Sequence, residues 1–175
     1  MTQLTGNERA AYVQDMFTKI ASRYDLMNRL MTGFQDVRWR RQVIKLARLT
    51  SASRLLDLGS GTGDLAREAI AQVPGLKVAA ADFTYEMMRV GAQTVGPLDF
   101  STADALRLPF KDATFDAVVS GFLMRNVIDV HKALQEQYRV LKTGGRIVIL
   151  DTTRPKKNLL RSEERRVGKE CRSRW

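Results

Sequence analysis

Leu55-Leu-Asp-Leu-Gly-Ser-Gly-Thr-Gly-Asp64 is the stretch of the sequence that decides the fold. Its apolar start predicts a buried β-strand that delivers the acidic Asp57, and Gly59, Gly61 and Gly63 then turn the chain into a helix. Glycine accepts a positive φ and lets the backbone approach a ligand closely, while a helix N-terminus presents unbonded N–H groups. The stretch therefore predicts a ligand-binding turn between a strand and a helix.

Short apolar runs alternate with helical segments from this turn onward. The expected strands are Arg54–Leu58, Lys77–Ala81 with Asp82 at its end, Asp99–Thr102, Phe115–Ser120 and Arg146–Asp151. The expected helices run from the turn to Val73, from Tyr85 to Thr94, and from the capping residue Asp129 to Leu141, with Gly144-Gly145 as the terminator. Strands that alternate with helices predict an α/β, Rossmann-like fold with a doubly wound, mostly parallel sheet.

Two helical stretches precede the first strand. Apolar residues recur at helical spacing over about residues 7–22 and again over about residues 25–49, with a break expected at Gly33. We expect residues 1–50 to form an N-terminal helical cap of the same domain, and residues 51–155 to form the α/β binding core.

The spacing of the glycines indicates which nucleoside the turn binds. It is G-x-G-x-G, whereas dinucleotide-binding enzymes use G-x-G-x-x-G, and Asp57 lies where it would repel a pyrophosphate. S-adenosyl-L-methionine carries a sulfonium, an ammonium and a carboxylate but no phosphate. The turn therefore favours S-adenosyl-L-methionine as the cofactor, although a tight turn without a ligand is the simpler alternative.

Acidic residues also follow the next two strands. Asp82 lies about 20 residues beyond the turn, where a carboxylate can accept both ribose hydroxyls. Asp104 and Ala105 follow the third strand, where the adenine would lie, and Asp104 can accept its amino group while Ala105 supplies a backbone N–H. Taken alone, Asp82 could be a solvated strand-end carboxylate and Asp104 could cap its own loop.

Composition limits the chemistry. A hydrophobic content of 44% supplies enough apolar side chains for a core. Cys171 is the only cysteine and His131 the only histidine, so a disulfide, a cysteine-based metal site and histidine-centred catalysis are not expected. With no apolar run of membrane-spanning length and no signal-like start, we expect a cytoplasmic protein. The net charge of +10 could attract anionic partners, or the charged residues could simply lie on solvated helix faces.

Residues 161–175 differ from the rest of the chain. They hold six Lys/Arg and three Glu with almost no apolar content, and they resemble the in-frame translation of a short-read sequencing adapter. We expect this tail to be artefactual; the alternative is a natural basic tail that binds an acidic partner.

Several motifs outside the turn resemble one family. They are Tyr24-Asp-x-Met-Asn28, Trp39-Arg40, Leu108-Pro-Phe-x-Asp-x-Thr-Phe-Asp116, Arg125-Asn-Val127 and Tyr138-Arg-Val-Leu-Lys-x-Gly-Gly-Arg146. Together with the glycine turn, these motifs resemble the ubiquinone/menaquinone biosynthesis C-methyltransferase family, within the class I S-adenosylmethionine-dependent methyltransferases. The resemblance covers about residues 10–155. It also implies two further strands, so we expect the chain to stop before the fold is complete.

The resemblance implies roles for particular residues. Thr62, Asp82, Asp104 and Ala105 match cofactor-contact positions, and Gly121 lies where the family would place a serine. The implied reaction methylates a ring carbon of a demethylated polyprenyl quinol, either demethylmenaquinol or a ubiquinol precursor. Arg125 and Asn126 are the expected catalytic residues, which would polarise a water that removes a proton.

The sequence also bears on substrate access and is compatible with other functions. Apolar side chains of the N-terminal helices could cover the site and bind the prenyl tail: Tyr24, Met27, Met31, Phe34 and Trp39. A peripheral membrane contact would bring the protein to such a substrate, and no nucleic-acid partner is expected. The alternatives are a class I methyltransferase that acts on another small molecule or on nucleic acid, and an inactive truncated fragment.

Overall fold

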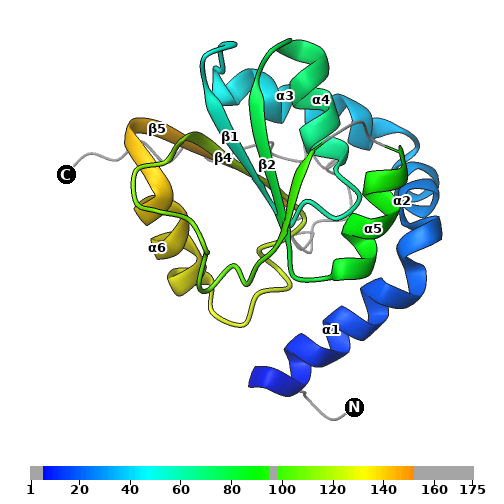
Figure 1. The fold of residues 1–175 in the computed structure, drawn as a ribbon. Helices are drawn as coiled ribbons and strands as arrows, with labels where there is room; N and C mark the ends of the chain where they lie inside the picture. Colours follow the sequence, from blue (N-terminus) through cyan, green and yellow to red (C-terminus); the bar gives the residue numbers. More distant parts are fainter. Residues whose placement is uncertain (1–5, 95–97, 152–175) are drawn as a thin grey trace, which may run out of the picture.

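The computed structural model describes residues 6–94 and 98–151. The helices are α1 (Gly6–Ile20), the short 3-10 helix η1 (Ala21–Arg23), α2 (Tyr24–Thr32), α3 (Gln35–Ala47), α4 (Asp64–Gln72), α5 (Tyr85–Thr94) and α6 (Val130–Val140). The strands are β1 (Arg54–Leu58), β2 (Lys77–Asp82), β3 (Asp99–Thr102), β4 (Phe115–Gly121) and β5 (Leu141–Leu150) (Figure 1). The tail at residues 161–175, including Cys171, lies outside the described residues.

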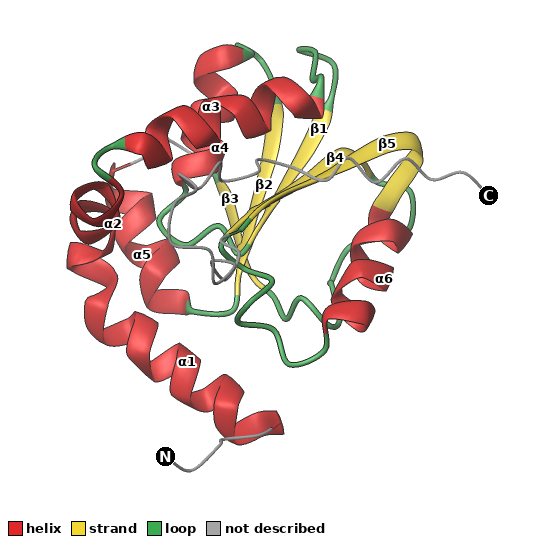
Figure 2. Ribbon diagram, turned by 180° about the vertical axis from the view of Figure 1, so that it is seen from behind, coloured by secondary structure: helices red, strands yellow, loops and turns green. Residues whose placement is uncertain are grey.

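The five strands form one parallel sheet in the order β3-β2-β1-β4-β5, with helices packed around it (Figure 2). The chain moves outward from β1 to β3 and then returns to the other side of β1 to make β4. The carboxyl ends of β1 and β4 therefore flank the point at which the strand order reverses, and ligands of open α/β sheets bind there. The predicted Rossmann-like fold class is confirmed.

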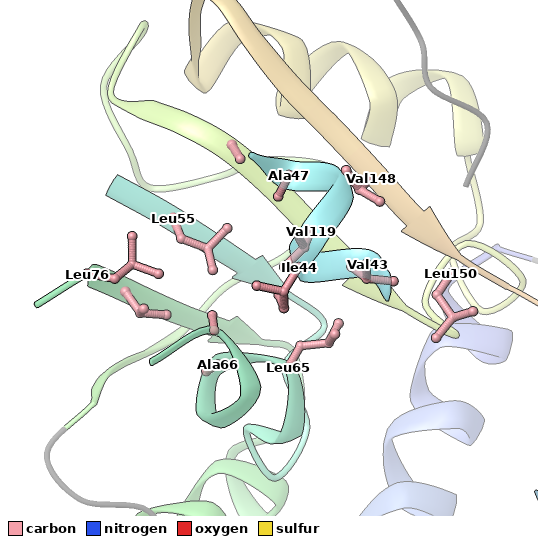
Figure 3. Close-up of a cluster of buried hydrophobic side chains, with 13 residues drawn as sticks. Val43, Ile44, Ala47, Leu55, Leu65, Ala66, Leu76, Val119, Val148 and Leu150 are labelled. Carbon is pink, nitrogen blue, oxygen red and sulfur yellow. The ribbon is translucent and has the colours of Figure 1, made fainter. Parts of the chain in front are cut away.

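Residue alternation along β1 builds a core on each face of the sheet. Leu55 belongs to a cluster in which α3 and α4 cover one face, with Val43, Ile44 and Leu65 among its members (Figure 3). Leu56 and its neighbours on the opposite face pack under α6. Successive side chains of a strand point to opposite faces, so a run of apolar residues is buried on both sides.

One boundary prediction is wrong. Helix α6 begins after Asp129, whose side chain accepts the Lys132 N–H as predicted, and it ends at Val140, one residue before the predicted end; β5, however, begins at Leu141 and not at the predicted Arg146. Both glycines lie inside β5, where the register to β4 shifts as in a β-bulge. A Cβ on Gly145 would lie 2.9 Å from the Asp116 carbonyl oxygen. Gly145 permits this close strand contact and Gly144 has a positive φ of 80°, so the two glycines shape β5 and do not terminate α6.

The predicted break at Gly33 is confirmed, because Gly33 has φ 57° and separates α2 from α3. Both helices lie on the same side of the molecule as α4, and α1 extends away from them (Figure 1). Across the described part of the chain, no helix has the length and apolar character that a bilayer crossing requires.

Candidate functional site

The turn after β1 is held against β2. Gly59, Gly61 and Gly63 have φ values of 68°, 56° and 88°, which explains why each position is glycine. The Ala81 carbonyl oxygen accepts the N–H of Gly59 at 2.8 Å and that of Ser60 at 3.1 Å. The Gly61 N–H donates to an Asp82 oxygen and the Gly63 N–H donates to the Ser60 carbonyl oxygen, both at 2.8 Å, so these N–H groups of the turn are bonded within the protein.

Gly91, a residue that was not predicted from the sequence, packs against this turn. Gly91, on α5, packs so closely that a Cβ there would lie 2.5 Å from the Thr62 carbonyl oxygen. A glycine inside a predicted helix costs helix stability, and this unexplained cost was the available signal.

Asp57 is fully buried at the carboxyl end of β1. Its Oδ2 accepts the Ala66 N–H at 3.0 Å, while its Oδ1 is buried without a hydrogen-bond partner in the described structure. Burial raises the pKa of Asp57 to about 7, and nearby Asp82 and Asp64 also favour its neutral form. A buried carboxylate with an unpaired oxygen is suited to a cationic ligand.

Asp82 ends β2 and joins the turn to the next helix. Its Oδ2 accepts the Gly61 N–H at 2.8 Å and its Oδ1 accepts the Thr84 N–H at 2.7 Å. Burial raises the pKa of the Asp82 carboxyl above its ordinary value, against the opposing effect of these hydrogen bonds. The predicted ribose-binding residue therefore also shapes the turn.

A single pocket at the carboxyl edge of the sheet brings most of the predicted residues together. The predicted residues that line it are Asp57, Gly59, Gly61, Thr62, Asp82, Asp104, Ala105, Gly121 and Asn126. Gly63 does not line it and instead caps α4. Asp104 is exposed and its Oδ1 accepts the Leu106 N–H at 2.8 Å, so it does cap its own loop. Its adenine-binding role remains a prediction.

The two predicted catalytic residues occupy different positions. Asn126 lines the pocket, and its side-chain nitrogen donates to the Phe122 carbonyl oxygen at 3.1 Å. Arg125 is not part of the lining: its guanidinium lies over the Phe122 ring and 3.8 Å from an Asp151 carboxylate oxygen. A direct contact between Arg125 and a bound acceptor therefore requires its side chain to turn inward.

A buried ion-pair network beside the pocket was not predicted. Arg40 of α3 lines the pocket, and its Nη1 lies 2.7 Å from an Asp36 oxygen and 2.6 Å from an Asp64 oxygen. Asp64 also pairs with Arg67. Asp36 and Arg40 share the helical spacing of the buried Val43, Ile44 and Ala47. Charges placed on the apolar stripe of a helix were the sequence signal for this network.

The network continues to the turn through the N-terminal helices. Thr62 Oγ1 donates to an Asp25 oxygen at 2.7 Å, and Arg67 lies 3.6 Å from the other Asp25 oxygen. The hydroxyl of Thr62 thus joins the turn to α2, while the predicted cofactor contact of Thr62 stays a prediction.

Helices α1 and α2 supply one apolar wall of the pocket through Val13, Phe17 and Tyr24. The edge of the Tyr24 ring also packs on Phe17, with the ring centroids 5.6 Å apart. The other apolar side chains proposed from sequence to cover the site lie elsewhere: Met27, Met31 and Phe34 are exposed, and Trp39 packs against the core under α3.

The comparison with known families decides the identity. The sequence profile of the ubiE/COQ5 methyltransferase family matches residues 3–165. The chain belongs to this family. The match confirms the family resemblance drawn from the sequence motifs, and it extends into the first residues of the tail.

Individual relatives agree with this assignment. The chain is 47% identical over 150 residues to the Ubiquinone/menaquinone biosynthesis C-methyltransferase UbiE of Desulfotalea psychrophila, covering 85% of this chain and 61% of the relative. It is 47% identical over 146 residues to a Demethylmenaquinone methyltransferase of Thermus thermophilus, covering 81% and 66%. The chain therefore spans about two thirds or less of the length of these relatives.

A solved structure gives the same fold. It is a protein from Methanococcus maripaludis described as a candidate S-adenosyl-L-methionine-dependent methyltransferase. The TM-score is 0.64 at 25% identity, and the match covers 77% of this chain and 64% of the other. The fold is that of a class I methyltransferase.

Proposed function

We propose that the protein is an S-adenosyl-L-methionine-dependent C-methyltransferase that methylates the ring of a demethylated polyprenyl quinol. The observation that carries the cofactor part is the fully buried Asp57, whose partnerless oxygen lies in a pocket between the glycine turn and Asp82. The names of the relatives and the family membership support the quinol part.

The residues present fit this cofactor better than they fit a dinucleotide. Four carboxyl groups line the pocket, those of Asp57, Asp64, Asp82 and Asp104, whereas its one described cation, Arg40, is already paired with two carboxylates. Such a lining disfavours a pyrophosphate and favours a ligand that carries positive charge. When bound, S-adenosyl-L-methionine supplies an electrophilic methyl group.

Three of these carboxyl groups have a place in this assignment. Asp57 would hold the ammonium group, and Asp82 would accept the ribose hydroxyls with the lone pairs that Gly61 and Thr84 leave unused. Asp104 and Ala105 would hold the adenine. The apolar wall of Val13 and Phe17 would exclude water from the methyl-transfer region.

The acceptor side needs a group that removes a hydroxyl proton. Loss of that proton pushes electron density onto the neighbouring ring carbon, which then becomes nucleophilic. Asn126, on the pocket wall, would orient a water at this hydroxyl, and Arg125 would lower the pKa of that water once it turns from Asp151. The ring carbon must also be aligned with the methyl group, and after the transfer it must lose its own proton to water so that the aromatic ring is restored.

The test is methyl transfer from isotope-labelled S-adenosyl-L-methionine to reduced demethylmenaquinone, with a demethylated ubiquinol precursor and transfer RNA assayed in parallel. We expect label in a quinol and none in RNA. Absence of label in both quinols despite binding of S-adenosylhomocysteine, or label in RNA alone, would contradict the proposed acceptor.

Variants at the mouth test the assigned roles. Arg125→Ala should lower kcat by about 100-fold, the usual range for a group that assists proton transfer, with little change in the affinity for S-adenosylhomocysteine. Arg107→Ala is the control, because Arg107 is an exposed arginine outside the pocket lining. A normal kcat/KM for Arg125→Ala would rule out its catalytic role.

A further inference from the structure

Helix α2 packs with its polar side toward the protein. Asp25 bonds to Thr62, and the Thr32 hydroxyl lies 2.9 Å from an Asp36 oxygen. A side-chain nitrogen of Asn28 and one of Arg29 are buried as well. A surface helix of a globular protein normally does the opposite and turns its apolar stripe inward.

The outward side of α2 is consequently apolar. Leu26, Leu30 and Met31 are 60%, 64% and 78% exposed, and Met27 and Phe34 are 44% and 59% exposed. The i, i+4 spacing of Leu26 with Leu30 and of Met27 with Met31 places these side chains on one face. We call these five residues the α2 apolar face. A contiguous group of large exposed apolar side chains marks an interaction surface.

The next helix presents cations to the solvent. Arg38, Arg41 and Lys45 are exposed and recur at three- and four-residue spacing on α3, the first of them four residues after Phe34. Within residues 6–94 and 98–151, only Arg41 of these three forms an ion pair, at 3.7 Å from Glu68. An apolar face followed by exposed cations is the pattern of a segment that lies in the interface of an anionic bilayer.

We propose that the α2 apolar face and the cations of α3 dock the protein on an anionic lipid surface. Charge complementarity favours lipid over a second copy of the chain, because a symmetric pairing through this face would bring like charges together. Tyr24 begins α2 and also lines the pocket wall, so the helix that carries the α2 apolar face borders the pocket. The benefit of docking there, access to a lipid-borne quinol, rests on the proposed function; the docking itself does not.

The experiment is co-sedimentation of the full chain with vesicles, without cofactor or quinol. Vesicles of phosphatidylcholine alone are compared with vesicles that also contain phosphatidylglycerol. We expect binding to the anionic vesicles only, weakening with salt, and at least about tenfold weaker binding for Leu30→Glu with Met31→Glu. Arg38→Glu with Lys45→Glu should remove most of the dependence on phosphatidylglycerol.

The matched control is Leu134→Glu with Tyr138→Glu, a change of two exposed apolar residues on α6. This variant should bind as the unaltered chain does. Every variant keeps the basic residues 161–175, so equal binding by Leu30→Glu with Met31→Glu would assign binding to another part of the chain and overturn the proposal.

Two further measurements separate the remaining outcomes. Quenching of tryptophan fluorescence by brominated lipid should be greater for Met31→Trp than for the unaltered chain, and this variant keeps the face apolar. Light scattering that shows a dimer which Leu30→Glu with Met31→Glu dissociates, without vesicle binding, would assign the α2 apolar face to a second copy. If the chain binds S-adenosylhomocysteine but does not bind vesicles, the docking proposal is wrong and the proposed function is unaffected.

Discussion

The sheet edge and the N-terminal helices both border the pocket, but they are built in opposite ways. At the sheet edge, apolar strand residues face the core and acidic residues stand only at strand ends, as with Asp57 and Asp82. On the helical side, Asp36 and Arg40 are buried while Leu30 and Met31 are exposed. The strands therefore set the position of the binding residues through the local sequence pattern. Ion pairs between residues far apart in sequence set the orientation of the helices.

Replacement of Arg40 should destabilise the packing of the N-terminal helices more than any other change. Arg40→Ala would leave the buried Asp36 and the mostly buried Asp64 without their shared cation, and a broken buried pair costs about 3–5 kcal/mol. We expect denaturant unfolding to show a loss of this size, with Arg41→Ala, at an exposed neighbour, changing stability by about 0.5 kcal/mol or less. Equal effects of the two substitutions would show that the network does not hold α3 to the turn.

Gly91→Ala tests the sheet edge with an effect of intermediate size. Alanine should stabilise a helix interior by about 1 kcal/mol, but here its Cβ would meet the Thr62 carbonyl oxygen at 2.5 Å. Overpacking of this kind costs about 1–3 kcal/mol, so we expect a net loss of thermal stability and weaker binding of S-adenosylhomocysteine. The control is Gln93→Ala, an exposed position on the same helix, and stabilisation by Gly91→Ala would contradict the close approach.

The contrast also explains which elements could be predicted from the sequence. The bounds of β1, α5 and β3 match the predicted ones, because each is a short segment whose pattern and flanking residues act locally. The start of β5 was misplaced at Arg146 because Gly144-Gly145 was interpreted as a helix terminator, whereas the register between β4 and β5 was the determining contact. Register joins residues far apart in sequence, and local patterns do not report it.

The residues of the candidate site differ in the same way in how well the sequence predicts them. Acidic residues at strand ends were found from spacing alone, since parallel strands bring their carboxyl ends to one edge. The ion pairs of Arg40 and the outward orientation of the α2 apolar face were missed because the side of a helix that packs depends on partners such as Asp64 and Thr62. Helix periodicity gives an apolar face but does not say which way it points.

Asp57 gives a pH test of the sheet edge. Its pKa of about 7 in the free protein means that it is largely protonated at pH 6 and largely ionised at pH 8. A bound ammonium group favours the ionised form, so affinity should rise with pH up to and through about 7. We expect calorimetry to show S-adenosylhomocysteine binding about tenfold tighter at pH 8 than at pH 6.

The matched variant for this test is Asp57→Asn, which keeps an oxygen for the Ala66 N–H. Its affinity should be weaker and independent of pH over this range. The stability of the free protein runs in the other direction, because a raised carboxyl pKa costs stability as pH climbs from the unfolded value toward 7. A pH dependence of binding that persists in Asp57→Asn would assign it to another group.

The smallest expected effect concerns the bond that joins the two regions. Thr62→Val keeps the shape of the side chain but removes the hydroxyl that donates to Asp25 at 2.7 Å, and a hydrogen bond to a charged group contributes about 1.5–3 kcal/mol. Partial exposure and the nearby Arg67 reduce this, so we expect a loss of about 1 kcal/mol. A double-mutant cycle with Asp25→Ala isolates the pair, because Asp25→Ala alone also removes the contact to Arg67. Thr62→Ser should retain the coupling, and a coupling energy near zero would mean that other contacts of α2, such as the Asp25–Arg67 pair, hold it in place.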